Sequence, residues 1–266
     1  MDGRMTAGQG AFEGRSVLVT GAGSGIGRVA ARRFAAEGAL VCAVDLQREA
    51  AQRVADGIVA AGGRAIACQA DVAQPADNQR MVEEAVRRHG GLDVAFLNAG
   101  YYGGPAVDLF EAPLSELDHV LAVNLRGCLL GVRAVVPALR VGGAIVVTAS
   151  AGGLLGVRAN PVYAAAKHGI VGLVRSLAPS LGERGLRINA VCPGGVRTAM
   201  TGFATEDLVA TPDALPLVEY GERAHPEHVA EVALFLASAR AGAVNGAAWV
   251  VDAGQTSVLA APPRAA

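Results

Sequence analysis

Short apolar segments alternate with amphipathic segments along almost the whole chain. The apolar segments are continuous runs that end at Gly, Asp or Asn, and such runs are typical of strands buried on both faces. The predicted strands are 16–20, 40–44, 65–70, 92–97, 145–148, 187–191 and 247–251. The predicted helices between them are 25–37, 47–61, 75–89, 114–139, 162–181 and 226–238. Pro179 falls inside one of these helices, which we expect to bend beyond Ala178.

This regular alternation predicts an α/β fold. We expect a single doubly wound Rossmann-type domain, with a parallel sheet of about seven strands flanked by helices on both faces. No linker or change in composition interrupts residues 14–254, which are predicted to form this domain. Flexible tails are predicted at 1–13 and 255–266. Residues 199–224 lack clear periodicity and are long for a structureless loop, so a substrate lid is predicted there.

Composition narrows the class of protein. Hydrophobic residues make up 52% of the chain and charged residues 18%, which argues against disorder. The formal charge of −1 gives no basic excess for a nucleic-acid partner. No uncharged apolar run of about 18 residues occurs, and the first residues are polar, so we expect neither a membrane span nor a signal peptide. The cysteines Cys42, Cys68, Cys128 and Cys192 lack metal or disulfide spacing, which favours buried thiols, no metal site and a cytoplasmic protein.

A glycine-rich segment follows the first predicted strand and opens the first predicted helix. Its sequence from Thr20 to Gly27 is TGAGSGIG, which departs from the strict G-x-G-x-x-G spacing. Glycines in this context let a pyrophosphate approach the free N–H groups at the helix N-terminus. The candidate cofactor-binding residues here are Gly21, Ser24, Gly25, Ile26 and Gly27.

The ends of the next strands supply further candidates, because open α/β sheets bind ligands at the carboxyl ends of their strands. The Asp45 carboxylate suits the adenosine ribose hydroxyls and would repel a 2′-phosphate, so the sequence predicts NAD rather than NADP. Arg28 and Arg48 argue against this preference for NAD, since either could neutralise such a phosphate. The other candidate contacts are Leu46, Asp71, Val72, Asn98, Ala99 and Gly100. Asp71 could also simply start the helix that follows it.

Tyr163 and Lys167 lie four residues apart on a predicted helix and therefore share a face. Removal of a hydride from an alcohol needs a base for the hydroxyl proton, and a free Tyr has a pKa of about 10. A cation at about 4 Å in a medium of dielectric about 20 supplies the roughly 4 kcal/mol that would bring this pKa to neutrality. Ser150 follows a strand, where its hydroxyl can stabilise a developing alkoxide. Asn124 on an apolar helix is either a buried structural amide or a functional one.

These motifs, taken in order, resemble the short-chain dehydrogenase/reductase family in its compact single-domain branch. They are T-G-x3-G-I-G at 20–27, N-A-G at 98–100, Asn124, Ser150, Y-x3-K at 163–167 and P-G-x3-T at 193–198. The resemblance implies that Tyr163 is the general base and acid. It also implies that Lys167 lowers the Tyr163 pKa and holds the nicotinamide ribose, that Ser150 stabilises the substrate oxygen and that Asn124 orders a water in a proton relay. The implied nicotinamide contacts are Pro193, Gly194, Val196 and Thr198. A homotetramer built through helices 114–139 and 162–181 is implied as well.

Substrate contacts are expected from the strand ends and the lid. The candidates are Tyr101, Tyr102, Leu154, Leu155, Val162, Gly195, Met200 and Phe203. Residues 199–222 contain no Lys or Arg, which argues against a phosphate-bearing substrate. The sequence therefore predicts an NAD-dependent oxidoreductase for a neutral, largely apolar secondary alcohol or ketone. The alternatives are an NADPH-dependent ketoreductase on an acyl or cyclic ketone, which Asp45 disfavours, and a catalytically silent dinucleotide-sensing protein, which the intact Ser, Tyr and Lys set disfavours.

Overall fold

The described part of the chain forms one parallel sheet with helices on both faces. A computed structural model describes residues 10–104, 109–203 and 215–257. Within them, the sheet has the strand order β3-β2-β1-β4-β5-β6-β7. The strands are β1 Ser16–Thr20, β2 Leu40–Asp45, β3 Arg64–Gln69, β4 Leu92–Leu97, β5 Leu139–Thr148, β6 Arg187–Pro193 and β7 Ala248–Val251. The α-helices are α1 Gly25–Ala36, α2 Arg48–Ala60, α3 Pro75–His89, α4 Leu114–Leu121, α5 Gly127–Val135, α6 Pro161–Gly182 and α7 Pro226–Ala237.

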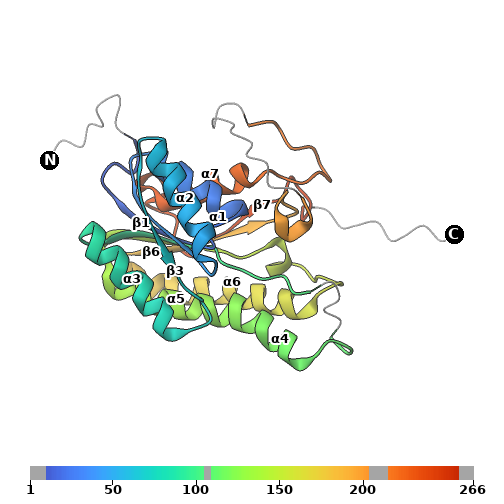
Figure 1. The fold of residues 1–266 in the computed structure, drawn as a ribbon. Helices are drawn as coiled ribbons and strands as arrows, with labels where there is room; N and C mark the ends of the chain where they lie inside the picture. The colour runs from blue at the N-terminus through green and yellow to red at the C-terminus, as the bar shows by residue number, and fades with distance from the viewer. Residues whose placement is uncertain (1–9, 105–108, 204–214, 258–266) are drawn as a thin grey trace.

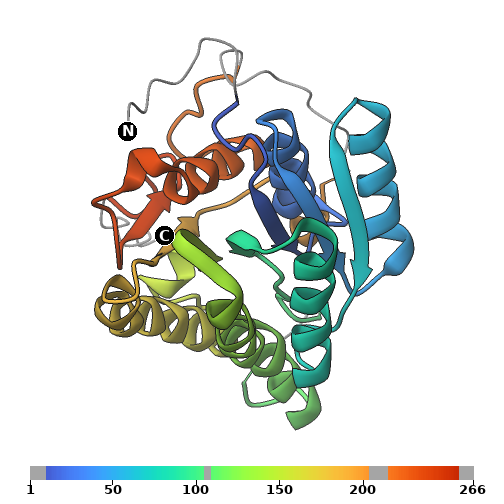
Figure 2. The same ribbon diagram turned by 90° about the vertical axis from the view of Figure 1, so that its left-hand side faces the viewer.

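Two hydrophobic layers hold the helices to the sheet, and Figures 1 and 2 show one set of helices on each face. On one face, side chains of α1, α2 and α7 such as Phe34, Ile58 and Leu236 pack on the sheet. On the other face, α3, α5 and α6 contribute side chains such as Met81 and Ile170. Burial on both faces explains why the strands are continuous apolar runs. The predicted fold class is confirmed.

The strand order reverses beside β1, and this point fixes where a ligand can bind. β1 pairs in parallel with β2 on one side and with β4 on the other. The connections that leave these strands at their carboxyl ends diverge to opposite faces of the sheet, which opens a crevice there. The glycine-rich segment and the end of β4 lie at the two sides of this crevice.

The predicted helix 114–139 differs from the structure in its middle and at its end. It is divided by a π-helical turn, Ala122–Arg126, and the helical segment finishes in a 3-10 turn, Val136–Ala138. β5 then begins at Leu139 rather than at 145, because its first residues pair with β4 through an irregular register. By length and composition alone, Leu114–Ala138 could cross a membrane, a test that core helices of soluble proteins also pass. Here α5 contacts α3 and β4, and α4 contacts α6, so the segment is part of the folded core.

Pro179 does not end α6, which continues to Gly182. A proline inside a helix removes one N–H donor and leaves the carbonyl four residues earlier without its partner. Pro179 and Arg175 both lie on the exposed side of α6, so water can bond the freed carbonyl. The helix therefore extends beyond Ala178, where we expected a bend.

Both predicted tails include residues that the structure describes and that contact the domain. Phe12 is 1% exposed, its ring packs edge-on against Phe34 at 4.8 Å, and its N–H donates to the Glu37 carbonyl. Residues 10–13 thus belong to the fold, in contrast to the predicted tail 1–13, because an aromatic side chain is buried there. At the other end, the Thr256 N–H donates to Asp252 Oδ2 at 2.7 Å. The remaining tail residues, 1–9 and 258–266, lie outside the described residues, as does 204–214 of the predicted lid.

A buried amide ties β6 to the segment that leads into β7. The Asn189 side chain is fully buried, its Nδ2 donates to the Val244 carbonyl at 2.8 Å, and its Oδ1 accepts from the Ala247 N–H at 3.0 Å. Buried backbone groups need such partners, because an unpaired one costs about 1–3 kcal/mol. Asn189 therefore aligns the last strand of the sheet.

We expect Asn189→Ala to lower the free energy of unfolding by about 2 kcal/mol, because it leaves these backbone groups without side-chain partners. Urea denaturation followed by circular dichroism measures the change. Gln52→Ala is the matched control, since Gln52 is exposed and its amide bonds only Asp56 among the described residues. It should change stability by less than about 0.5 kcal/mol. Equal losses in the two variants would contradict the role given to Asn189.

Candidate active site

A cleft of about 680 Å³ opens at the carboxyl ends of the strands, beside the point where the strand order reverses. Most predicted site residues line it: Gly21, Ser24, Gly25, Ile26, Asp45, Leu46, Asp71, Val72, Asn98, Ala99, Gly100, Tyr101, Tyr102, Ser150, Tyr163, Lys167, Pro193, Gly194, Gly195, Val196, Thr198 and Met200. The predicted residues outside its lining are Gly27, Asn124, Leu154, Leu155, Val162 and Phe203. Lining residues that the sequence analysis missed include Gln47, His119, Val157, Thr201 and Arg223. Among the described residues, no group of three or more His, Cys, Asp or Glu is placed to hold a metal ion.

The glycine-rich segment lies so close to neighbouring backbone that side chains would not fit. A Cβ at Gly21 would stand 2.9 Å from the Ala99 Cα, and Gly21 itself has a φ of +63°. A Cβ at Gly27 would stand 2.1 Å from the Gly21 carbonyl oxygen. Gly27 therefore serves helix packing rather than the cleft surface. Ser24 precedes α1, whose first N–H groups have no partner within the helix and are suited to an anion.

Asp45 is held at the end of β2 by two backbone donors. The Gly23 N–H donates to Asp45 Oδ2 at 2.9 Å, and the Gln47 N–H donates to Oδ1 at 3.0 Å. Each carboxylate oxygen keeps a lone pair for a ligand hydroxyl, because it accepts only one of these bonds. The residues at this end of the cleft thus fit the adenosine ribose of a dinucleotide.

A second pocket, of about 570 Å³, adjoins Asp45 and is basic. Arg28, Arg32 and Arg53 line it together with Asp45. The sequence analysis named Arg28 and Arg48 as groups that could neutralise a 2′-phosphate, and only Arg28 of these two lines this pocket. The end of the cleft that would hold the adenosine ribose therefore has a carboxylate, Asp45, and guanidinium groups in the adjoining pocket.

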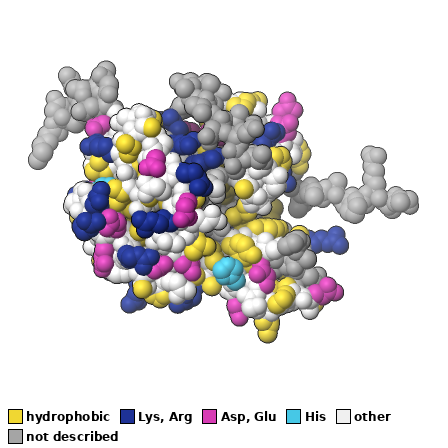
Figure 3. All heavy atoms as spheres, viewed as in Figure 1, with side chains coloured by type: hydrophobic (Ala, Val, Ile, Leu, Met, Phe, Trp, Pro, Cys, Tyr) yellow, Lys and Arg dark blue, Asp and Glu magenta, His cyan; other side chains and the backbone are white. Residues whose placement is uncertain are grey.

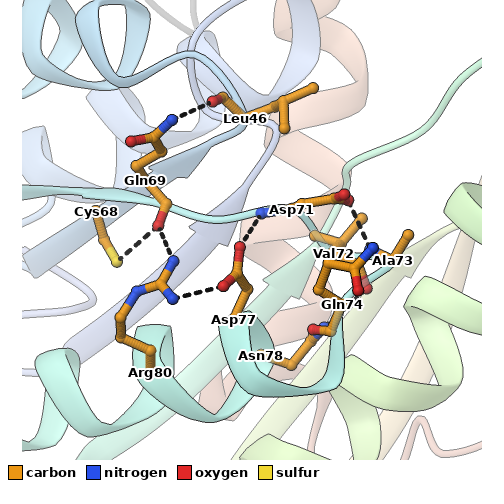
Figure 4. A network of polar contacts seen from close by, with 10 residues as sticks. All are labelled: Leu46, Cys68, Gln69, Asp71, Val72, Ala73, Gln74, Asp77, Asn78 and Arg80. Carbon is orange, nitrogen blue, oxygen red and sulfur yellow. Dashed lines mark hydrogen bonds and ion pairs between the residues drawn. The ribbon is translucent and has the colours of Figure 1, made fainter.

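Asp71 both lines the cleft and shapes the start of the next helix, while its contact with a cofactor stays a prediction. It lines the cleft, and its Oδ1 accepts the Ala73 N–H at 2.9 Å, which shapes the turn into α3. Figure 4 shows Asp77 between Asp71 and Arg80: Asp77 Oδ2 accepts the Asp71 N–H at 2.8 Å, and Oδ1 lies 2.5 Å from Arg80 Nη1. The hydrogen bond from Arg80 holds the pKa of Asp77 below its usual value. This network fixes the backbone that Asp71 and Val72 present to the cleft.

Thr20 and Asn98 join the central strands at the floor of the cleft. Thr20 Oγ1 accepts the N–H groups of Asn98 and Ala99 at 3.0 and 3.1 Å. Thr148 Oγ1 donates to Asn98 Oδ1 at 3.0 Å, and Asn98 Nδ2 donates to the Thr20 carbonyl at 3.2 Å. The ends of β1, β4 and β5 are thereby linked through side chains, and the cleft has a rigid floor.

Ser150, Tyr163 and Lys167 meet in the cleft from two elements. Ser150 follows β5 and its Oγ accepts the Gly152 N–H at 3.0 Å. Tyr163 lies in the first turn of α6, where its N–H donates to Asn160 Oδ1, the helix N-cap, at 2.9 Å. Lys167 lies one turn further along, and its Nζ is 5.5 Å from the centroid of the Tyr163 ring.

Lys167 is a buried cation. It is 2% exposed, and its Nζ donates to the Thr148 carbonyl at 2.8 Å. Burial lowers the pKa of Lys167 to about 8. Burial likewise raises the pKa of Tyr163 to about 12, while the hydrogen bond with Ser150 acts in the opposite direction and lowers it.

In this structure the Lys167 Nζ bonds a backbone carbonyl, and burial is the main cause that raises the Tyr163 pKa. The expectation that Lys167 lowers the pKa of Tyr163 stays a prediction. A further positive charge in the cleft would shift its pKa downward and favour the basic form.

Asn124 lies in the π-helical turn and is 1% exposed. Its Nδ2 donates to the carbonyls of Tyr101 and Val120 at 2.6 and 2.9 Å, and its Oδ1 accepts the Tyr101 N–H at 3.3 Å. The side chain thus holds the chain beyond β4 against the helix. A role of Asn124 in a proton relay stays a prediction.

The substrate candidates divide into residues that face the cleft and residues that do not. The Tyr101 hydroxyl donates to Glu116 Oε1 at 2.9 Å, while the Tyr102 ring lies 4.9 Å from the Tyr163 ring. Leu154 packs against the core and Leu155 is exposed, so neither lines the cleft. Both leucines follow the 3-10 turn Ala151–Gly153, and a role for them as substrate contacts stays a prediction.

Known proteins resemble this chain over nearly its whole length. A family model described as enoyl-(acyl carrier protein) reductase matches residues 21–256. The chain is 40% identical over 248 residues to cyclohexanol dehydrogenase of Acinetobacter sp. (strain SE19), covering 92% of this chain and 96% of that enzyme. It is 38% identical to meso-2,3-butanediol dehydrogenase of Serratia marcescens, again covering 92% and 96%. The crystal structure of levodione reductase superposes with a TM-score of 0.84 at 34% identity, covering 93% of this chain and all of that one. With these relatives and the motifs placed around one cleft, the chain belongs to the short-chain dehydrogenase/reductase family of oxidoreductases.

Proposed function

We propose that this protein transfers a hydride between NAD(H) and a neutral, largely apolar secondary alcohol or ketone. The observation that carries the proposal is the presence of Ser150, Tyr163 and Lys167 in the same cleft as Asp45 and the glycine-rich segment. The names of the relatives support the substrate class, since cyclohexanol dehydrogenase and meso-2,3-butanediol dehydrogenase are named for secondary alcohols. Apolar side chains such as Val157 line the cleft as well.

The cofactor proposal rests on the adenosine end of the cleft. The Asp45 carboxylate, held by two backbone donors, would accept both ribose hydroxyls and oppose a 2′-phosphate. The N-terminus of α1 would hold the pyrophosphate, and Thr198, Val196 and Pro193 would line the nicotinamide. When bound, NAD supplies the acceptor for the hydride.

The proposed chemistry assigns each polar group one task. In oxidation, the Tyr163 oxygen takes the hydroxyl proton as the hydride leaves the carbinol carbon; in reduction, it returns this proton to the oxygen. Ser150 Oγ donates a hydrogen bond to the same oxygen and stabilises its developing charge. Lys167, held by the Thr148 carbonyl, supplies a fixed positive charge and would bond the nicotinamide ribose.

We also propose a homotetrameric assembly and a cytoplasmic location. Leu121 of α4 and Leu129 of α5 are 37% and 43% exposed, and an apolar face of this kind fits the homotetramer that the sequence implies. The four described cysteines are free, as is typical of a reducing compartment, which fits a cytoplasmic protein. Figure 3 shows basic and acidic side chains interspersed over α2 and α3, a surface that fits small-molecule rather than nucleic-acid partners.

Tyr163→Phe is expected to lower kcat/KM at least about 10³-fold, because it removes the group that moves the proton. The measurement is the absorbance of reduced nicotinamide with NAD and a panel of cyclic and aliphatic secondary alcohols. Tyr102→Phe is the matched control, since this neighbouring phenol also lines the cleft. It should change kcat/KM by less than about tenfold. Comparable activity of wild type and Tyr163→Phe would exclude the mechanism, and binding of NAD without turnover would favour the silent dinucleotide-sensing alternative.

Asp45→Ser is expected to weaken NAD binding about tenfold and to strengthen NADP binding. The substitution removes the acceptor for the ribose hydroxyls and the carboxylate that repels a 2′-phosphate, while the neighbouring guanidinium groups stay. Calorimetric titration with each cofactor measures both affinities. Asp71→Ser, at the end of β3, is the control and should leave the ratio of the two affinities unchanged. A wild-type preference for NADP would instead support the NADPH-dependent ketoreductase alternative.

Ser150→Ala is expected to move the pH dependence of alcohol oxidation toward higher pH. Oxidation needs the deprotonated Tyr163, so its rate rises with pH through the Tyr163 pKa. Burial raises this pKa and the hydrogen bond with Ser150 lowers it, so loss of the hydroxyl leaves it higher. The profile of kcat/KM against pH measures the shift, and Ser176→Ala on the exposed side of α6 is the control. An unchanged profile in Ser150→Ala would show that the rising limb does not report Tyr163.

A further inference from the structure

Arg223 is a cation in the cleft that the proposed mechanism does not use. The charged side chains in the lining are Asp45 and Asp71 at the adenosine end, and Lys167 and Arg223. Lys167 bonds the Thr148 carbonyl and lies beside Tyr163. Arg223 therefore stands out among the described lining residues as a charged donor without an assigned task.

The backbone of Arg223 is fixed against the segment that follows β6. Val196 and Ala224 form a parallel bridge, in which the Arg197 N–H donates to the Ala224 carbonyl at 3.0 Å and the Ala224 N–H donates to the Gly195 carbonyl at 2.9 Å. The bridge thus holds Val196 beside Ala224, although the two residues are far apart in sequence. Arg223 consequently has a defined place over the cleft, although it lies on an exposed segment.

Its side chain lies over Gly195 and beside an aromatic ring. A Cβ at Gly195 would stand 3.2 Å from Arg223 Cγ and 3.4 Å from Nη1, so the absence of a side chain there makes room for the arginine. The Arg223 guanidinium carbon is 5.4 Å from the centroid of the Phe203 ring, a cation–π distance. Phe203 also supports Arg197, at 6.0 Å, which does not line the cleft. The same ring thus contacts one arginine that lines the cleft and a matched one that does not.

A guanidinium offers several N–H donors and no acceptor, so a ligand oxygen is its natural partner. No carboxylate of the described residues forms an ion pair with Arg223. Gly195, which the Arg223 side chain contacts, lines the cleft together with Pro193 and Gly194. In the proposed mechanism Ser150 and Tyr163 bind the reacting oxygen, so Arg223 would be left for a different oxygen of the ligand.

We propose that Arg223 is a specificity-determining residue that binds a second oxygen acceptor of the substrate, separate from the reacting oxygen. The inference rests on the proposed function and narrows its substrate class to secondary alcohols and ketones that carry a further keto, hydroxyl or carboxylate oxygen. Arg223 directly follows residues 199–222, which contain no Lys or Arg, and it belongs to the predicted lid 199–224. Apolar lining would hold the carbon skeleton, and Arg223 would select for the distal oxygen.

Binding of three matched ketones to the protein saturated with NAD tests this inference without turnover. Cyclohexanone has no second oxygen, cyclohexane-1,4-dione adds a neutral one, and 4-oxocyclohexanecarboxylate adds a charged one. Ligand-observed NMR titration gives their affinities for wild type, Arg223→Leu and Arg197→Leu. We expect wild type to bind the dione or the keto acid about tenfold more tightly than cyclohexanone, as one charge-assisted hydrogen bond supplies. This preference should fall to within about twofold in Arg223→Leu and persist in Arg197→Leu.

Two further measurements distinguish a specific loss of the binding preference from misfolding of the variant. Unchanged NAD affinity shows that Arg223→Leu is folded, and Phe203→Leu should lose part of the preference because it removes the platform under the guanidinium. The dione and the keto acid show whether the second oxygen is neutral or charged. No preference in wild type, or an equal loss in Arg197→Leu, would overturn the inference. Failure of wild type to oxidise NADH with any ketone would instead count against the proposed function, whatever the binding data show.

Discussion

The site depends on a buried positive charge. Removing an ammonium group from water costs several kcal/mol, so Lys167 can be 2% exposed only where fixed dipoles receive it. The Thr148 carbonyl at the end of β5 does so, and Thr148 is in turn bonded through its hydroxyl to Asn98 on β4. The preceding turn of α6 carries Tyr163, whose phenolate is disfavoured by burial. The Lys167 charge thus links three features of the site: the point where the strand order reverses, the floor of the cleft and the first turns of α6.

Most of the fold could be predicted because its signals are local. β1, β2 and β4 are apolar runs bounded by polar residues, and buried strands require this pattern. The start of β5 was missed because Leu139–Gly143 is largely exposed and has no such pattern. The π-helical turn at Asn124 leaves no trace in periodicity, since it changes hydrogen bonds rather than residue types. Phe12 was assigned to a tail because one aromatic residue in a polar segment does not reveal its burial against Phe34.

The chemical residues were easier to predict than the residues that shape the cleft. Ser150, Tyr163 and Lys167 form an ordered motif, and the fold brings them together through β5 and α6 alone. Tyr101 lines the cleft and the leucines after Ser150 do not, a difference that the sequence could not show because side-chain direction depends on the local turn. Arg223 was missed because it reaches the cleft through the bridge between Val196 and Ala224, a tertiary contact without a sequence signal. The structure was also needed to see how deeply Tyr163 is buried, because burial is the main cause that raises its pKa.

We propose that this cleft moves a hydride and a proton between two bound molecules. The most direct measurement uses NADH labelled with deuterium at the transferring carbon, incubated with the protein and a cyclic ketone such as cyclohexanone or cyclohexane-1,4-dione. The account predicts an alcohol that carries one deuterium on its carbinol carbon, detected by mass spectrometry and NMR. Formation of an alcohol without the label, or cofactor binding with no alcohol from any ketone of the class, would contradict it.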